Sequence, residues 1–207
     1  GEPVIFAQAV DTKDPGFVGF NRFAHGRTLA DPDYRPFKSP NADTLYSNAY
    51  LDLRGGPVLF EVPDTAGRYY TANFLDIHGN ATNISARTHG TKGGRFLIAP
   101  VGWNGTAPEG VTLFRVATPV MWILLRVLAD GPADIRKANA LQDRFLLTAT
   151  GEPPKTPAWP DGRDESAIGF FRILDFILRT CGHPKGEDAL VYRYQAMGIA
   201  GHRSFDE

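Results

Sequence analysis

Residues 43–53 of this 207-residue chain read Asp-Thr-Leu-Tyr-Ser-Asn-Ala-Tyr-Leu-Asp-Leu. Leucine, serine and alanine alternate there with threonine, tyrosine, asparagine and aspartate. A period of two is typical of a β-strand, and here it predicts one apolar face and one polar, aromatic face. Gly55-Gly56-Pro57 follows and is expected to end the strand in a turn.

Five more strands are predicted from similar patterns. They are short, rich in β-branched and aromatic residues, and separated by turns that contain glycine or proline. The last of them is apolar on both faces, which predicts a central strand of the sheet. The five cover residues 58–62, 68–78, 95–99, 111–116 and 119–128.

After residue 130 the pattern changes to the period of a helix. Apolar side chains form single stripes in residues 133–147 and 164–180, and residues 187–197 and 17–25 are also expected to be helical. The roughly 45 residues after the Pro-rich connector at 151–162 are too few for an independent core. Strands first and helices last predict one α+β domain over residues 1–207, with a mainly antiparallel sheet and C-terminal helices packed on it.

The composition excludes several classes of function. Lys plus Arg number 22 and Asp plus Glu 23, so the net charge of −1 provides no strong field for nucleic acid or an anionic membrane. The single cysteine, Cys181, rules out a disulfide framework and a cysteine-based zinc site. No apolar run approaches the ~20 residues of a membrane span. No signal peptide is visible, although one could have been removed, so the compartment stays open.

The run Ser39-Pro40-Asn41-Ala42-Asp43-Thr44-Leu45-Tyr46, which leads into Asp52-Leu53, carries a family signal. It resembles the signature of the bacterial family called domain of unknown function 1254, and nearly all of the chain follows that family's order of blocks. The resemblance implies a β-rich fold with helices, and it implies little about chemistry. Further blocks are Asn21-Arg22-Phe23, Val62-Pro63-Asp64, Gly67-Arg68-Tyr69-Tyr70, Arg87-Thr88 and Met197-Gly198-Ile199.

Two differences from the family matter for function. Members often continue into a second β domain, called domain of unknown function 1214, and the resemblance implies that this partner is absent here or is a separate chain. Members also tend to run from the aspartate at position 76 almost directly into Thr82-Asn83. Here Ile77-His78-Gly79-Asn80-Ala81 intervenes, so the loop and its ligand are expected to differ.

Asn41, Asp43 and Tyr46 stand where a turn enters the first strand. Asp43 could act as a base, Tyr46 as a hydrogen-bond donor or acid, and Asn41 as an orienting amide at the mouth of a pocket. The same residues are equally typical of an Asx turn and of a tyrosine at the edge of a core. Both interpretations stay open.

Asp76 and His78 lie two apart in a strand and therefore share a face with Tyr70. A carboxylate and an imidazole on one face could form an acid–base pair, make structural hydrogen bonds or, with His89, hold a metal. Because the spacing does not single out a metal geometry, we predict no metal site and no cofactor.

Arg126 interrupts an otherwise apolar strand, on the same face as Trp122. A buried guanidinium must be paired, because an unpaired charge in a core costs several kcal/mol. Asp43 or Asp76 could pair with it, or it could receive a substrate carboxylate. The hypothesis is that one pocket gathers Asn41, Asp43, Tyr46, Asp76 and Arg126.

These residues favour an enzyme that uses side-chain acid–base chemistry on a small, mainly apolar molecule bearing a carbonyl or carboxylate, although whether the chain is an enzyme stays open. The alternatives are a non-catalytic ligand-binding module and a structural half that docks a second β domain or a second copy. The catalytic candidates are Asp43, Tyr46, Asp76 and His78, and the substrate-binding candidates are Asn41, Tyr70, Trp122 and Arg126.

Overall fold

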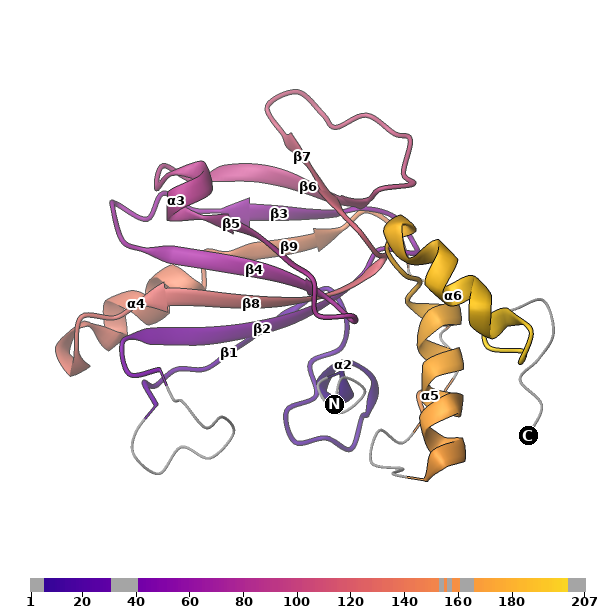
Figure 1. Cartoon of the computed structure of the whole chain (residues 1–207). Coiled ribbons are helices and arrows are strands. Elements are labelled where there is room, and N and C mark those ends of the chain that lie inside the picture. The colour runs from indigo at the N-terminus through magenta and orange to yellow at the C-terminus, as the bar shows by residue number, and fades with distance from the viewer. Residues whose placement is uncertain (1–5, 31–40, 153–154, 156–157, 161–165, 201–207) are drawn as a thin grey trace.

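The computed structural model describes residues 6–30, 41–152, 155, 158–160 and 166–200. The described strands form two sheets that pack face to face, with helices at both ends (Figure 1). The predicted α+β, mainly antiparallel and β-rich class is confirmed. The single sheet expected from the order of strands and helices is instead divided in two.

The first sheet has five strands, all paired antiparallel, in the order β1-β2-β8-β4-β5. The predicted central strand is confirmed, because β8 lies between β2 and β4. β5 pairs along the far side of β4 and closes one edge. The bounds are β1 Phe23–His25, β2 Thr44–Asp52, β4 Tyr70–Asp76, β5 Ala81–Ser85 and β8 Val120–Leu128.

The second sheet has four strands in the order β7-β6-β3-β9. Its pairs are antiparallel except for β6 with β7, which is parallel. Parallel neighbours need a connection that runs back along the sheet, and the loop after Pro100 provides it. The bounds are β3 Val58–Val62, β6 Gly94–Pro100, β7 Thr112–Val116 and β9 Leu146–Ala149.

The core lies between the two sheets and is rich in aromatic side chains. Phe60 of β3 meets Phe74 of β4 edge to face, with ring centroids 6.0 Å apart. Tyr70 packs on Phe145 at 5.5 Å. Alternation along β2 and β8 directs Leu45, Leu125 and their neighbours inward, where they are fully buried. Each inner face is therefore covered by the other sheet.

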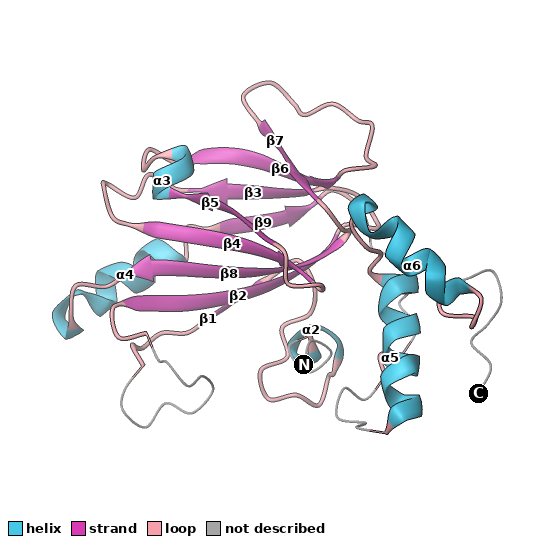
Figure 2. Cartoon of the chain, viewed as in Figure 1, coloured by secondary structure: helices cyan, strands magenta, loops and turns pink. Residues whose placement is uncertain are grey.

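Two groups of helices flank the sandwich (Figure 2). α4, Ile135–Gln142, follows a short 3₁₀ turn, η1, at Pro132–Asp134 and buries Ala138 and Leu141 in the core. α5, Ala167–Thr180, lies at the other end, where the side chain of Ser166 caps its start. The remaining elements are α2 Ala7–Val10, α3 Ala86–His89, η2 Lys185–Glu187 and α6 Asp188–Gln195.

Three predicted elements were wrong in part. The helix expected over 133–147 ends at Gln142, because Phe145 turns into the core and Leu146 begins β9. Residues 17–25 contain β1 rather than a helix. The helix expected from Asp164 begins at Ala167, and residues 161–165 lie outside the described residues, as does Pro40 of the signature.

Candidate functional site

Among the described residues, packing on the outer face of the five-stranded sheet is found at one end. There Phe6 beside α2 and Ile177 of α5 pack with Tyr50 and Trp122 of the sheet. Further along the same strands, the pairing places a mixed set of side chains on the same outer side. We call this set the polar face; it consists of Tyr46, Asn48, Thr71, Asn73, Leu124 and Arg126.

Arg126 is the central charged group of the polar face. It lies directly opposite Tyr46 on β2 and Thr71 on β4. Its guanidinium carbon stands 5.1 Å from the centroid of the Tyr46 ring, within the range of a cation–π contact. Its Nε is buried and makes no hydrogen bond to the described residues, and none of their carboxylates lies within 4.0 Å of its nitrogens.

Other polar side chains near Arg126 form hydrogen bonds with one another. The Trp122 indole donates a hydrogen bond to Asn48 Oδ1 at 3.1 Å, and the Thr71 hydroxyl donates to Asn73 Oδ1 at 3.1 Å. Thr71 is buried, whereas Asn48, Asn73 and Trp122 are partly exposed. The polar face thus combines a guanidinium, amides, a hydroxyl and aromatic rings at a partly exposed surface.

Asn41 and Asp43 occupy the turn that leads into β2. Asn41 Oδ1 accepts from the backbone N–H groups of Asp43 and Thr44 at 3.2 and 3.1 Å, and its amide donates to Thr44 O. That is an Asx turn. The Asp43 carboxylate is exposed, and the Asp43 carbonyl accepts from Ala129 N at 2.9 Å. The geometry therefore supports the turn interpretation for Asn41.

Asp76 lies at the opposite end of the sheet from Arg126. In the β4–β8 register, Thr71 faces Arg126 and Asp76 faces Met121. Five residues of strand separate the two positions, about 17 Å. The structure does not bring Asp76 and Arg126 together.

Hydrogen bonds fix both Asp76 and His78 in the turn after β4. Asp76 Oδ1 accepts from the backbone N–H groups of His78 and Asn80 at 2.9 Å each, and Oδ2 accepts from the Asn80 amide at 3.0 Å. His78 Nε2 donates to Gly182 O, just beyond α5, at 2.9 Å. A cavity of about 310 Å³ opens beside Asp76, with walls that include Phe74 and Met121.

Tyr70 is a core residue rather than a ligand contact. It is 1% exposed, and its hydroxyl donates to Gly90 O at 3.2 Å. Burial raises the pKa of Tyr70 above its ordinary value. Its side chain points between the sheets, on the side opposite the polar face.

A metal cluster would need at least three ligand side chains close together. Within the described part of the chain, no group of three or more His, Cys, Asp or Glu side chains gathers in this way. His89, the third member of the metal alternative, packs edge-on against Phe96 at 5.0 Å. His78 instead donates its hydrogen bond to Gly182 O, just beyond the end of α5.

A hydrogen-bond network on the inner side of β2 could not be predicted from the sequence patterns. Gln142, which is fully buried, donates to Tyr46 O and Gly26 O at 3.2 Å and lies 2.9 Å from Ser47 Oγ. Ser47 Oγ in turn lies 2.8 Å from His25 Nδ1. Burial, together with the charge of Arg27, lowers the pKa of His25. These partners are 22 to 116 residues apart, so no local spacing could have indicated them.

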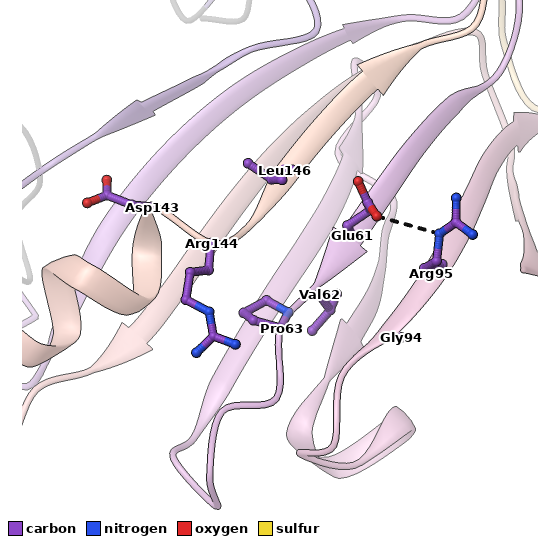
Figure 3. Close-up of a pocket in the computed structure, with 8 residues that line it drawn as sticks. All are labelled: Glu61, Val62, Pro63, Gly94, Arg95, Asp143, Arg144 and Leu146. Carbon is purple, nitrogen blue, oxygen red and sulfur yellow. Dashed lines mark ion pairs between the residues drawn. The ribbon is translucent and has the colours of Figure 1, made fainter.

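A cleft of about 450 Å³ lies where β3, β6 and β9 meet (Figure 3). Glu61 and Arg95 face each other across one side of it, with 3.5 Å between Oε1 and Nε. Arg95 is exposed and Glu61 is partly exposed, so solvent screens this ion pair. None of the residues predicted for a site lines the cleft, but Asp143 and Leu146 also line a second one between β1 and β9.

Comparison with solved structures identifies a similar fold. The crystal structure of the VPA0106 protein from Vibrio parahaemolyticus matches 99% of this chain with a TM-score of 0.75 and 23% sequence identity. The match covers 49% of the VPA0106 chain, so the present chain spans about half the length of that protein.

A comparison with curated proteins found no match to the chain. Separately, none of the described helices is long and apolar enough to cross a membrane. The family model described as "Protein of unknown function (DUF1254)" matches residues 20–149, which include every strand of both sheets. Because this match extends over more than half of the chain, the protein belongs to the DUF1254 family.

Proposed function

We propose that the polar face binds a small, mainly apolar molecule with a carbonyl or carboxylate and supports acid–base chemistry on it. The observation that carries this proposal is Arg126, whose buried Nε makes no hydrogen bond to the described residues. A desolvated donor without an acceptor is unfavourable, so a ligand oxygen that accepted from it would gain more than a solvent-exposed contact provides.

The surroundings of Arg126 fit such a ligand. Thr71 and Asn73 offer further hydrogen-bonding groups on the adjacent strand, while Leu124 and Trp122 offer apolar surface. A guanidinium presents its donors as a planar fork that matches the two oxygens of a carboxylate. The cation–π contact with Tyr46 holds that fork against the sheet.

Tyr46 is the proposed acid–base group, because its ring already contacts the guanidinium that would hold the ligand. Asp43 is three residues away in the preceding turn and is exposed, so it remains a candidate base. The hydrogen bonds of Asp76 and His78 support structural roles instead.

Ligand-induced stabilisation tests the binding step. Short aromatic and aliphatic carboxylates should raise the melting temperature of the protein, with their matched primary alcohols as controls. Arg126→Gln should abolish the part of the effect that comes from the polar face, together with the ligand-induced backbone amide shifts of Thr71 and Asn73. Arg136→Gln, which changes an exposed arginine of α4, should retain it. Carboxylate-induced amide shifts of Thr71 and Asn73 that survive Arg126→Gln would overturn the proposal.

A second measurement separates an enzyme from a binding module. In an enzyme, Tyr46→Phe should reduce turnover of the bound ligand by about 10²–10⁴-fold while binding persists. In a binding module, wild-type protein would leave the ligand unchanged, as followed by NMR of the ligand over time. The second outcome would remove the catalytic half of the proposal.

A docking function is the second candidate, and the C-terminal helices favour it. Apolar side chains stand exposed on α5 and α6: Phe170 is 61% exposed, Leu190 52% and Tyr192 73%. Such groupings mark interaction surfaces. The match covers 49% of the VPA0106 chain, and the unmatched part of that chain suggests a second domain as the occupant.

The docking function predicts behaviour of the isolated chain. An uncovered apolar surface should self-associate, so sedimentation velocity should show a concentration-dependent dimer. Replacing Phe170 and Tyr192 by serine should remove the dimer and leave carboxylate binding intact. A chain that is monomeric at every concentration, before and after the replacement, would count against docking through these helices.

A further inference from the structure

A cleft of about 250 Å³ separates the edge strands of the two sheets, β1 and β9. Its walls include Arg22, Phe23 and His25 from the first sheet and Leu146 and Leu147 from the second. The cleft lies on the inner side of β2, because His25 faces Ser47, whereas Tyr46 belongs to the outer side. It is therefore distinct from the polar face.

The hydrogen bonds around Ser47 determine which nitrogen of His25 carries a proton. Ser47 Oγ has two partners, Gln142 Nε2 at 2.9 Å and His25 Nδ1 at 2.8 Å. An amide nitrogen can only donate, so the hydroxyl hydrogen of Ser47 has His25 Nδ1 as its acceptor. The hydrogen of the neutral imidazole must then lie on Nε2.

This arrangement leaves the Nε2–H of His25 available. It makes no hydrogen bond to the described residues, and His25 lines the cleft. Protonating Nδ1 would deprive the buried Ser47 hydroxyl of its acceptor, so the network favours the neutral ring. The lowered pKa of His25, caused first by burial and then by Arg27 and opposed by Asp143, agrees with that state.

The charges and apolar groups around the cleft indicate what could bind there. Asp143 is paired with Arg27, with 2.5 Å between Oδ1 and Nη2, and this offsets the negative charge of the wall. Arg22 is exposed and makes no ion pair with the described residues. Phe23 stacks on His25 with 5.5 Å between ring centroids, and Leu146 is 51% exposed.

We propose that this cleft is a second binding site, which takes a small carboxylate with an apolar body. The Nε2–H of His25 donates to one carboxylate oxygen, and Arg22 supplies the compensating positive charge. The apolar body lies against Phe23 and Leu146. Gln142 and Ser47 act as positioning residues, because they fix the tautomer of the ring.

Imidazole NMR tests the proposal with benzoate as the probe. The free protein should show His25 protonated on Nε2, and benzoate should shift the Nε2 resonance of His25 in a saturable way. His183 is the internal control: its Nε2 already pairs with Asp188 at 2.9 Å, so its signals should not move. A proton on Nδ1, or a His25 signal that benzoate leaves in place, would refute the proposal.

Variants separate this site from the polar face. Backbone amide shifts of Leu146 and Leu147 report benzoate binding without the imidazole. His25→Phe should weaken binding in the cleft at least about tenfold, and Arg22→Gln several-fold, as expected for a lost hydrogen bond or surface charge. Arg126→Gln should leave these shifts unchanged even if it abolishes binding at the polar face. Equal binding by wild type and His25→Phe would overturn the assignment.

Ser47→Ala tests the positioning role. It should convert His25 from the Nε2–H form to a mixture of tautomers and weaken benzoate binding, while the amide spectrum stays that of the folded protein. A purely structural role for Ser47 would leave the tautomer unchanged, and that result would remove the positioning step.

Discussion

The two ends of the β4–β8 pair carry charged residues in opposite situations. At one end, the Asp76 carboxylate accepts three hydrogen bonds within its own turn, and α5 packs against the same end of the sheet. At the other end, the buried Nε of Arg126 makes no hydrogen bond to the described residues. A charged group whose hydrogen bonds are made within its own turn stabilises the fold. A buried donor that makes no hydrogen bond to the described residues is instead available to a ligand.

The largest effect expected from this comparison is that of Asp76→Ala. The substitution leaves two backbone N–H groups and the Asn80 amide without their acceptor, so the free energy of unfolding should fall by about 3 kcal/mol. Chemical denaturation measures the loss. Asp43→Ala, which removes an exposed carboxylate, is the matched control and should change stability little. Similar losses in both variants would break the comparison.

A smaller loss is expected from His78→Leu. The substitution removes the hydrogen bond to Gly182 O that ties the turn after β4 to the end of α5, a loss of about 1 kcal/mol. Hydrogen exchange should also show faster opening of the last turn of α5, with the β2 amides as the reference. Unchanged exchange in α5 would mean that apolar packing alone holds the helix there.

At the other end, Arg126→Met should cost no stability. The change removes an unsatisfied buried Nε while keeping an apolar stem, so the free energy of unfolding should stay constant or rise by up to ~1 kcal/mol. Denaturant midpoints of the two proteins provide the measurement. A loss as large as that of Asp76→Ala would show that Arg126 is structural and would remove the main support for a ligand at the polar face.

The smallest effect concerns pH and His25. Because the folded-state pKa of His25 lies below its ordinary 6.5, the unfolded chain binds a proton that the folded protein does not. The contribution of His25 to stability is therefore complete above about pH 6.5 and is lost as pH falls below that value. Denaturation at about pH 7.5 and about pH 5.5 should show a difference that His25→Gln reduces. An identical difference in the variant would contradict the network around Ser47.

Most of the architecture could be predicted from local patterns. Strands β2, β3, β4, β6, β7 and β8 each follow a period of two or an apolar run bounded by turns, and β8 was correctly placed at the centre. The short strands β1, β5 and β9 were missed. β9 is largely exposed and is held by its pairing with β3, almost ninety residues earlier, so its own sequence carries little strand signal.

For the candidate site, the sequence could predict which residues share a face of a strand, but not which residues of different strands lie close together. Alternation correctly grouped Arg126 with Trp122, and it also grouped Tyr70 with Asp76. Alternation carries no information on register, so it could not show that Asp76 and Arg126 lie five strand positions apart. Nor could it show that a second sheet covers the face of Tyr70, because that contact joins strands distant in sequence.

The place of β8 has a consequence for folding during synthesis. β2 and β4 both pair with β8 and not with each other, although β8 follows the end of β2 by almost seventy residues. At about 5–20 residues per second, a ribosome needs roughly 4–15 s to supply the missing strand after β2 is complete. During that interval β2 has an unpaired edge that β4 cannot cover. A pause in translation before residue 120 should therefore favour aggregation of the nascent chain, whereas a pause after residue 128 should not.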